Sequence, residues 1–277
     1  MNRTGLFVAL ALALFFGLLF GVYTGLDLKI TALFYNPVTK TFPLQTRAGA
    51  EIIRFAAMWI SWAFTFPAMV ALIVKLARPV KPLMMSGRAM TFLLVTIFLS
   101  AIILPNAAFK SHWSRPRPTS VAEFNGNLKF MPWWDPRGQC PKNCSFFSGE
   151  GATAFWTYAP ATLAPPAWRP LAYVGATAFG VAISGGRVAF GGHFFTDVMA
   201  AALVTFFVIW LAYALIYRWP STRLTDEGVD AWLTRVAWPG YRWLQKLRGH
   251  DVGPAPRLRP GTETVSATGS DGIKALP

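Results

Sequence analysis

The chain has 277 residues, of which 54% are hydrophobic and 14% charged, and its mean hydropathy is +0.40. Soluble domains contain about a quarter charged residues, so this composition excludes an ordinary soluble, fibrous or disordered protein and indicates an integral membrane protein. Lys and Arg outnumber Asp and Glu by 26 to 12, a net charge of +14, and in so hydrophobic a chain this excess favours anionic lipid or a phosphorylated substrate over nucleic acid as the partner.

Six apolar stretches approach the length of a membrane-spanning helix. They lie at about residues 5–26, 55–77, 90–109, 151–166, 171–184 and 198–217. A spanning helix needs roughly 20 apolar residues. The fourth and fifth stretches are shorter, so each also fits a buried or re-entrant helix. We expect an all-α, polytopic membrane protein built as a six-helix bundle.

The first stretch begins like a secretory signal peptide, because Arg3 precedes an apolar run. A signal core has roughly 7 to 15 apolar residues. The run here is longer, and no convincing small-residue cleavage site follows it. We therefore expect a retained first helix.

The apolar stretches define a membrane domain at residues 1–217, with a motif core at about 90–217 and a long polar and aromatic loop at 110–149. With six crossings, both termini lie on the same side of the membrane. The 75–88 loop carries four Lys or Arg residues and no acid, which favours the cytoplasm for this loop and both termini. The 27–54 segment on the opposite side also carries four cations, which weakens the bias. The 110–149 loop is then expected in the periplasm.

The remaining chain, residues 218–277, is expected to be a basic cytoplasmic tail. Its 229–248 stretch is amphipathic, which is typical of a helix that lies on the inner membrane surface. Beyond about Gly249 the tail is rich in Gly, Pro, Ser and Thr, and we expect this part to be disordered.

The chain has only two cysteines, which excludes a disulfide scaffold. Cys140 and Cys144 lie in the 110–149 loop and make a sensible small disulfide only in an oxidising compartment. Two unlinked thiols are the alternative.

Ionisable side chains at a membrane boundary are costly unless they have a function. Eight lie next to or between the apolar stretches, all at the same expected end of the bundle: Lys110, His112, Arg115, Arg117, Glu150, Arg187, His193 and Asp197.

His193 and Asp197 are four residues apart, which on a helix places both side chains on one face. A carboxylate that holds one imidazole nitrogen leaves the other free as a nucleophile or general base. The alternative is a histidine at a helix start, with Asp197 stabilising the helix dipole.

Three cations are candidates for holding an anion. Arg187 precedes His193 by six residues and is flanked by glycine pairs that let the backbone approach a ligand. Lys110 and Arg117 lie in a segment stiffened by two prolines, which favours a preset anion cradle. The alternatives are an arginine that snorkels at a helix end and a segment that binds lipid headgroups.

Ser148, Gly149 and Glu150 begin the fourth apolar stretch, where the free N–H groups of a helix start can bind an anion. A helix cap at Ser148 with a first-turn acid at Glu150 is the alternative. Together with the cations, these groups would hold a phosphoryl group while His193 attacks phosphorus and Asp197 steadies the imidazolium. The chain offers three histidines, so we expect no metal cluster and no cofactor.

The candidates form a three-part pattern: Lys110-x(6)-Arg117-Pro118, Ser148-Gly149, and Ser184-x(2)-Arg187-x(5)-His193-x(3)-Asp197. This pattern resembles the signature of the type 2 phosphatidic acid phosphatase superfamily of membrane phosphatases, over roughly residues 50–217. The resemblance implies a six-helix bundle and metal-independent hydrolysis of a phosphomonoester or diphosphate through a phosphohistidine. It also implies that His193 is the nucleophile, that Asp197 is its partner, and that phosphate is held by Lys110, Arg117, Arg187, Ser148 and Gly149.

Two positions depart from the family pattern. The family usually has serine directly before the arginine of the third motif, where this chain has Gly186, with Ser184 two residues earlier. The second motif normally ends in a histidine that protonates the leaving oxygen, and this chain has Glu150 there. Either Glu150 is the acid, or the leaving group departs with little help. His112 is an alternative acid, and Arg115 an additional cation for the site.

The Ser-Phe-Phe-Ser-Gly-Glu sequence that follows the cysteines resembles the Gram-negative lipid A phosphatases of this superfamily. This narrower resemblance implies an inner-membrane enzyme that removes the 1- or 4′-phosphate of lipid A at the periplasmic face. Trp113, Trp133 and Trp134 would then lie beside the lipid, or else form a structural aromatic belt. The alternatives are an undecaprenyl diphosphate phosphatase, a lipid phosphotransferase of the same superfamily and, less favoured, a non-enzymatic lipid-binding protein.

Overall fold

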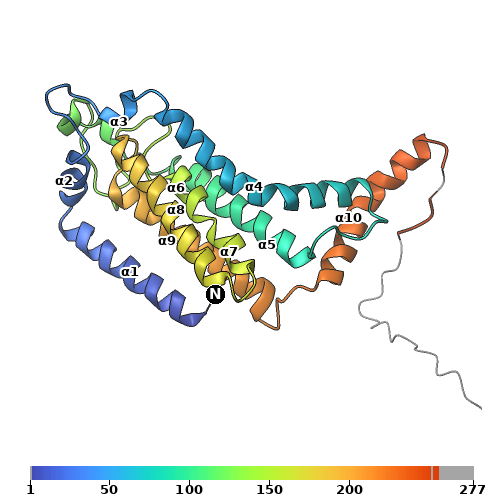
Figure 1. Ribbon diagram of the computed structural model, residues 1–277. Coiled ribbons are helices and arrows are strands. Elements are labelled where there is room, and N and C mark those ends of the chain that lie inside the picture. The colour runs from blue at the N-terminus through green and yellow to red at the C-terminus, as the bar shows by residue number, and fades with distance from the viewer. Residues whose placement is uncertain (1, 251, 256–277) are drawn as a thin grey trace, which may run out of the picture.

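The computed structural model describes residues 2–250 and 252–255, and these residues form an all-helical structure (Figure 1). No β-strand occurs within the described ranges; two isolated bridges pair Asn36 with Thr41 and Val121 with Leu128. The disorder expected in the tail concerns mainly residues 256–277, which lie outside the described residues.

The helices follow one another with short connections, except for the long loop before α6. In chain order they are α1 (Arg3–Val22), α2 (Leu26–Ala32), α3 (Pro43–Thr46), α4 (Ala50–Ala77), α5 (Gly87–Ile97), η1 (Phe98–Phe109), η2 (Pro118–Ser120), η3 (Ala122–Phe124), α6 (Gly149–Phe155), α7 (Tyr158–Leu163), α8 (Arg169–Ala189), α9 (Phe195–Tyr213), η4 (Ala214–Arg218) and α10 (Asp226–Leu247). The π-helical segments η1 and η4 directly continue α5 and α9.

Side-chain caps fix where several of these helices begin. Asn2 Oδ1 accepts a hydrogen bond of 2.9 Å from the Gly5 N–H at the start of α1. Ser86 and Thr225 cap α5 and α10 in the same way. A cap satisfies one of the N–H groups that a helix start leaves without a partner, and typically contributes about 1 kcal/mol.

Five helices in the described ranges are long and apolar enough to cross a membrane: Arg3–Val22, Ala50–Ala77, Gly87–Phe109, Arg169–Ala189 and Phe195–Arg218. They cover five of the six expected stretches. The fourth stretch is not one long helix, because it is divided into α6 and α7. Pro160 explains the break, since proline has no N–H and its ring clashes with the carbonyl four residues earlier, here that of Trp156.

The pair of short helices α6 and α7 nevertheless runs antiparallel to α8 along most of its length. The Phe155 ring of α6 packs on Gly180. Further along, Tyr158 Oη is 2.7 Å from Thr177 Oγ1, and Thr162 Oγ1 is 3.0 Å from Tyr173 Oη. Successive residues of α6 and α7 therefore contact successively earlier turns of α8.

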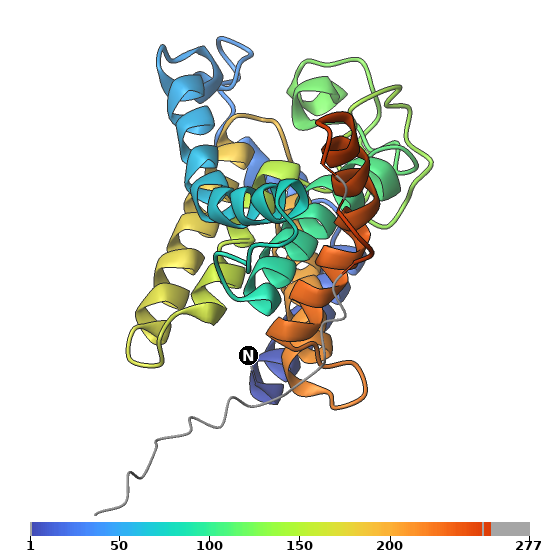
Figure 2. The ribbon, with the colours of Figure 1, turned by 90° about the vertical axis from the view of Figure 1, so that its right-hand side faces the viewer.

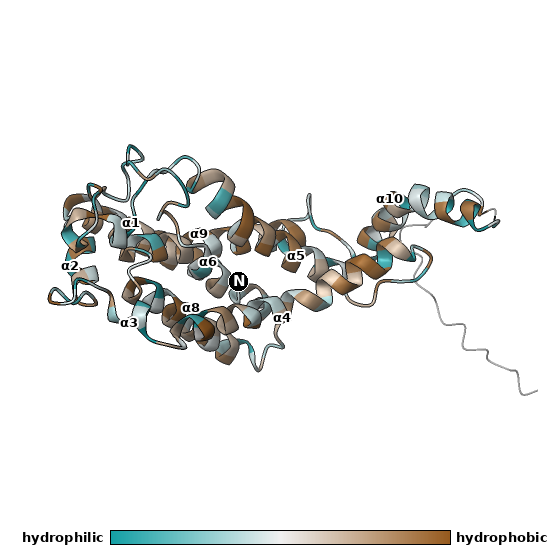
Figure 3. Ribbon diagram, turned by 90° about the horizontal axis from the view of Figure 1, so that it is seen from above, coloured by the Kyte–Doolittle hydropathy of each residue, from teal (hydrophilic) through white to brown (hydrophobic). Residues whose placement is uncertain are grey.

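The bundle has two different ends. Figure 1 shows α2, α3 and the long loop at one end and α10 at the other; Figure 2 views the molecule from the α10 side. Hydrophobic colour dominates the helices between the two ends (Figure 3). On α1 and α4, large apolar side chains such as Leu14 and Trp59 are 64% and 72% exposed. Such faces suit contact with lipid chains and would be unfavourable in water.

The packing of α6 on α8 depends on a small residue at position 180. A Cβ atom on Gly180 would collide with the Phe155 ring, whereas Gly175 on the same helix has no neighbour within 4 Å. We expect Gly180→Ala to lower the free energy of unfolding by about 1–3 kcal/mol through overpacking. Gly175→Ala should raise it by roughly 0.5–1 kcal/mol, because alanine favours helix. Thermal unfolding in detergent measures both changes, and equal effects would contradict this packing.

Candidate active site

The residues of the three sequence motifs gather at the bundle end that carries the long loop. Helices α6 and α9 begin there and α8 ends there, so residues 148, 187 and 193–197 are brought together although they belong to different helices. The loop between η1 and α6 supplies residues 110–147 at the same end.

His193 lies buried in the short turn between α8 and α9. Its Nδ1 is 2.8 Å from the backbone oxygen of Ser145. A carbonyl oxygen only accepts, so Nδ1 carries the proton and Nε2 keeps its lone pair. Burial lowers the pKa of His193 to about 4, against a smaller opposing effect of Asp197. The imidazole is therefore neutral at physiological pH, as a nucleophile must be.

Asp197, in the first turn of α9, is fully buried and holds several groups at once. It accepts hydrogen bonds from Arg115 Nη1 at 2.5 Å, Ser145 Oγ at 2.5 Å and the Phe194 N–H at 2.8 Å. Its Oδ2 is 3.7 Å from His193 Nδ1, which is too long for a hydrogen bond. Asp197 therefore orients His193 mainly through Ser145, whose hydroxyl it binds and whose carbonyl binds the imidazole.

Arg115 lies behind Asp197 and does not face a phosphate site. Its side chain is fully buried, with Nη2 2.7 Å from Asp27 Oδ2, Nη1 bonded to Asp197 and Thr196, and Nε donating to the Met131 carbonyl. Burial alone would lower the pKa of Arg115, but the two carboxylates outweigh it and raise the pKa. The expectation that Arg115 is an additional phosphate-binding cation is corrected: its donors are already committed to protein acceptors.

Arg187 and Arg117 approach the turn that carries His193. Arg187 is in the last turn of α8, and a Cβ on Gly192 would lie 2.5 Å from its Nη2, so only glycine allows this approach. Arg117 Nη1 donates to the Gly192 carbonyl at 3.2 Å, and Nε and Nη2 donate to Asn143 at 3.0 Å. Both guanidinium groups are thus fixed beside the histidine.

Lys110 lies next to the start of α6. A Cβ on Gly149 would be 3.6 Å from Lys110 Nζ. Burial and the positive charge of Arg117 lower the pKa of Lys110, while Glu150 opposes them. The ammonium group is therefore in a partly desolvated cationic cluster, which a phosphate would stabilise.

The start of α6 closes another side of the cluster. Ser148 is fully buried and caps the helix, with its Oγ accepting from the Gly151 N–H at 3.1 Å, and its own N–H donates to the Asp197 carbonyl at 3.3 Å. Ser184 of α8 faces Gly151 from the other side, with its Oγ 3.2 Å from where a Cβ on Gly151 would lie. The hydroxyl of Ser148 thus acts as a cap, and the exposed start of the helix is at Gly149.

Glu150 lies between two arginines. Its Oε2 is 3.3 Å from Arg54 Nε and 3.5 Å from Arg187 Nε. All three atoms are buried and lack a hydrogen bond of good geometry. Glu150 is thus a carboxylate between two cations. The Nε–H groups of Arg54 and Arg187 remain available to donate to other oxygen atoms.

The remaining candidates lie around the cluster. His112 is exposed, and its Nδ1 is 3.0 Å from the Ala108 carbonyl in its own turn.

Cys140 and Cys144 are joined by a disulfide, and they line a cavity of about 330 Å³ together with Lys110. Within the described ranges, no three His, Cys, Asp or Glu side chains form a metal-ligand cluster.

The loop tryptophans have different surroundings. Trp113 and Trp133 pack against Phe146 in a buried aromatic cluster, and Trp113 Nε1 donates to the Trp133 carbonyl at 2.8 Å. Trp134 is 48% exposed. Two of the three, which are partly buried, therefore pack within the loop, and Trp134 is the most exposed of the three.

Sequence reasoning missed Ser145, Asp27 and Arg54. Ser145 is adjacent to the second motif, but its contribution is partly a backbone carbonyl, which no residue type indicates. Asp27 follows the first apolar stretch, and an acid at a membrane boundary was a usable signal. Arg54 was counted only among the cations that bear on topology.

The site can be compared with known proteins. Residues 89–221 match the model of the PAP2 superfamily. This part of the chain is therefore similar to the PAP2 superfamily. The match covers all three motifs, and it confirms the superfamily resemblance seen in the sequence. The comparisons accordingly indicate a phosphatase, a phosphoric monoester hydrolase, and its apolar helices are long enough to cross a membrane.

Three curated relatives carry the name lipid A 4′-phosphatase. The protein of Francisella tularensis subsp. novicida is 29% identical over 219 residues, which cover 79% of this chain and 98% of the relative. That of Rhizobium leguminosarum is 32% identical over 43% of this chain and 52% of the relative, and that of Rhizobium etli 33% identical over 37% and 40%. No solved structure matches the chain significantly.

The buried ion pairs of Arg115 predict a large effect on stability. We expect Arg115→Met to lower the free energy of unfolding by about 3–5 kcal/mol, because Asp27 and Asp197 would remain buried without their cation. Arg88→Met, which removes an arginine paired with the 38% exposed Asp226, should change the melting temperature far less, because water can solvate the remaining carboxylate. Thermal unfolding compares the two variants, and equal melting temperatures would contradict this arrangement.

Proposed function

We propose that the protein removes the 4′-phosphate from lipid A at the periplasmic face of the inner membrane, through a phosphohistidine intermediate on His193. The observation that carries this proposal is the neutral imidazole whose Nδ1 is fixed by Ser145 beside Arg117 and Arg187, at the polar end of an apolar bundle. The names of the curated relatives favour lipid A and its 4′ position.

The chemistry follows from the positions of these groups. His193 Nε2 attacks phosphorus in line with the leaving sugar oxygen, forming an N–P bond as the P–O bond breaks. Lys110, Arg117 and Arg187 neutralise the phosphoryl oxygens, together with the backbone at Ser148 and Gly149, and Arg54 is added to this set. Asp197 stabilises the charged imidazole. Water then cleaves the N–P bond, releasing inorganic phosphate and restoring neutral His193.

The proposed topology has six crossings, with α6 and α7 together forming the fourth. Residues 149–163 cover roughly 22 Å at 1.5 Å per residue, and their contacts with α8 extend over most of that helix. The start of α1 and helix α10 then lie on the same side, where the cationic 75–88 loop favours the cytoplasm. The disulfide in the 110–149 loop suits a periplasmic site.

We further propose two parts for the chain, a phosphatase domain at residues 1–217 and a cytoplasmic tail at 218–277. The tail's α10 is packed on the domain rather than separate from it. Val229 and Leu233 are buried in the same apolar cluster as residues of α4, α5 and α9. The tail is therefore a structural extension of the bundle up to that point.

Activity on lipid A tests the proposal. Purified protein in mixed lipid and detergent micelles should release one phosphate from lipid A, with loss of the 4′-phosphate seen by mass spectrometry. His193→Ala should abolish release because the nucleophile is gone, and Arg187→Ala should slow it on the order of 10³-fold. His112→Ala, outside the cluster, should retain activity. Lipid A left with both phosphates by the wild-type protein, or full activity of His193→Ala, would refute the proposal.

The role proposed for Glu150 is that of general acid for the sugar oxygen. A 4′-alkoxide is a poor leaving group and needs a proton. In the structure Glu150 is paired with Arg54 and Arg187, and a bound phosphate would compete for these arginines.

Leaving-group dependence distinguishes this role from simple orientation of the arginines. Glu150→Gln should slow hydrolysis of lipid A by roughly 10²-fold or more, but should change hydrolysis of an aryl phosphate, whose leaving group needs no proton, far less. Glu51→Gln is the matched control, because Glu51 also pairs with Arg54, at 3.6 Å, but is 65% exposed. Equal slowing of both substrates by Glu150→Gln would assign Glu150 to positioning the arginines.

A further inference from the structure

Helix α10 lies across the end of the bundle opposite the active site rather than along it (Figure 1). An ion pair and hydrogen bonds hold its first half to the end of α4, to the loop that follows and to the start of α5. Asp230 Oδ1 is 2.9 Å from Lys75 Nζ and accepts from the Leu83 N–H at 3.0 Å. Asp226 accepts from Ser86 Oγ at 2.7 Å and from the Arg88 N–H at 2.9 Å. These contacts place α10 at the level where α4 leaves its apolar span.

Helix α10 also carries an apolar stripe that is more than half exposed in the part of the chain that the structure describes. Trp232, Val236, Trp243 and Leu247 are separated by four, seven and four residues, so they fall within an arc of about 60° on the helix. Their exposed fractions are 59%, 53%, 65% and 66%. Two tryptophans and two aliphatic side chains on one exposed face need an apolar environment, and tryptophan is enriched where that environment meets water.

A row of cations runs beside this stripe. Arg235, Arg242 and Lys246 are spaced by seven and four residues and are all exposed. Residues 231–250 contain four Lys or Arg residues and no Asp or Glu. An apolar stripe bordered by cations is the pattern of a helix that lies in the interface of an anionic membrane.

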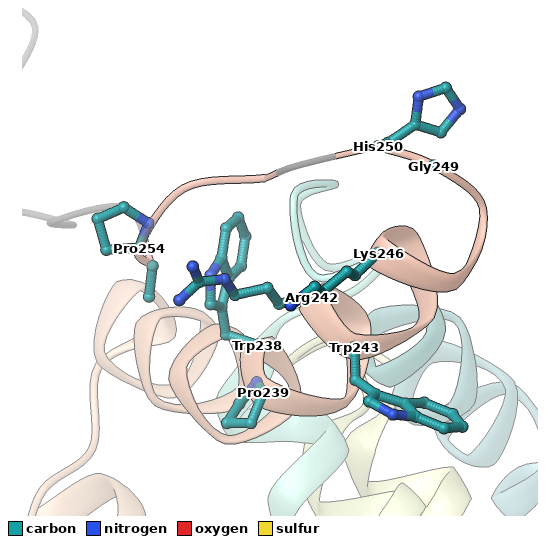
Figure 4. Close-up of a pocket in the computed structure, with 9 residues that line it drawn as sticks. Trp238, Pro239, Arg242, Trp243, Lys246, Gly249, His250 and Pro254 are labelled. Carbon is teal, nitrogen blue, oxygen red and sulfur yellow. The ribbon is translucent and has the colours of Figure 1, made fainter.

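Two of these cations, Arg242 and Lys246, line a pocket beside α10. Trp238, Arg242 and Lys246 line it on the helix side, and residues 249 and 254–255 line it on the other, enclosing roughly 770 Å³. Trp238 Nε1 donates to the Gly253 carbonyl at 3.1 Å, which holds the returning chain over the helix. Figure 4 shows Trp238 and Arg242 beneath that chain, and Trp243 is also among the residues that line the pocket.

We propose that this face of α10 binds anionic phospholipid in the membrane leaflet opposite the active site. Arg242 and Lys246 take the headgroup phosphate, and Trp243 and Leu247 enter the boundary between headgroups and acyl chains. Charge complementarity selects phospholipid as the occupant, since a second copy of α10 would bring the same cations together. The proposal depends on the membrane location of the chain and not on the phosphatase reaction.

Hydrogen exchange on the full-length protein in lipid nanodiscs tests the proposal. Amides of residues 238–248 should exchange at least about tenfold more slowly in discs that contain phosphatidylglycerol than in discs of phosphatidylcholine alone, since each cation near an anionic surface strengthens binding. The double variant Arg242→Gln/Lys246→Gln should lose this difference. Arg78→Gln/Lys81→Gln, which removes two exposed cations at the same end of the bundle, should keep it. Unchanged exchange in α5 shows that each variant is folded.

Results of three kinds would overturn the proposal. One is equal exchange in the two kinds of disc, and another is a lipid effect that survives the Arg242→Gln/Lys246→Gln change. The third is protection that requires two copies per disc, or that inorganic phosphate produces in phosphatidylcholine discs, because neither needs an anionic membrane surface.

Discussion

The buried ion pair between Arg115 and Asp197 holds together parts of the chain that are far apart in sequence. Arg115 comes from the long loop and Asp197 from the first turn of α9, and Asp27 joins them from α2. A buried charge without its partner costs several kcal/mol, so the three segments can only fold together. The loop is thereby fixed over the helix ends, which brings the Ser145 carbonyl to His193 and fixes the proton on Nδ1.

The same constraint separates the charges of the molecule into two groups. The apolar middle of the bundle cannot accommodate unpaired charge, so ionisable side chains collect at its two ends. At one end Lys110, Arg117, Arg187 and Arg54 lie around Glu150 in a partly desolvated cluster. At the other, the cations of α10 lie exposed beside an apolar stripe. Burial therefore distinguishes cations suited to a transferred phosphoryl group from cations suited to a membrane surface.

Partial burial would also strengthen the interaction of this cationic cluster with a phosphoryl group. Electrostatic interactions strengthen as water is excluded, and groups already fixed by the protein need no reorganisation during the reaction. Asn143 and the Gly192 carbonyl hold Arg117 in place, and the absence of a side chain at Gly192 admits Arg187. The histidine is neutral for the same reason, since burial disfavours its charged form.

The apolar spans and the residue types that meet at one end could be read from the sequence, because hydropathy and motif spacing are local properties. His193, Asp197, Arg187, Arg117 and Lys110 each lie at or near a helix end, and alternating helices bring those ends together. Three features required the tertiary structure. Ser145 lies between Asp197 and His193, Arg115 points away from the cationic cluster, and Arg54 is part of that cluster. These outcomes depend on where a loop side chain points and on contacts between residues as far apart as Arg54 and Glu150. The division of the fourth stretch was only partly predictable. Pro160 is visible in the sequence, but the contacts with α8 determine that the broken helix still runs along the bundle.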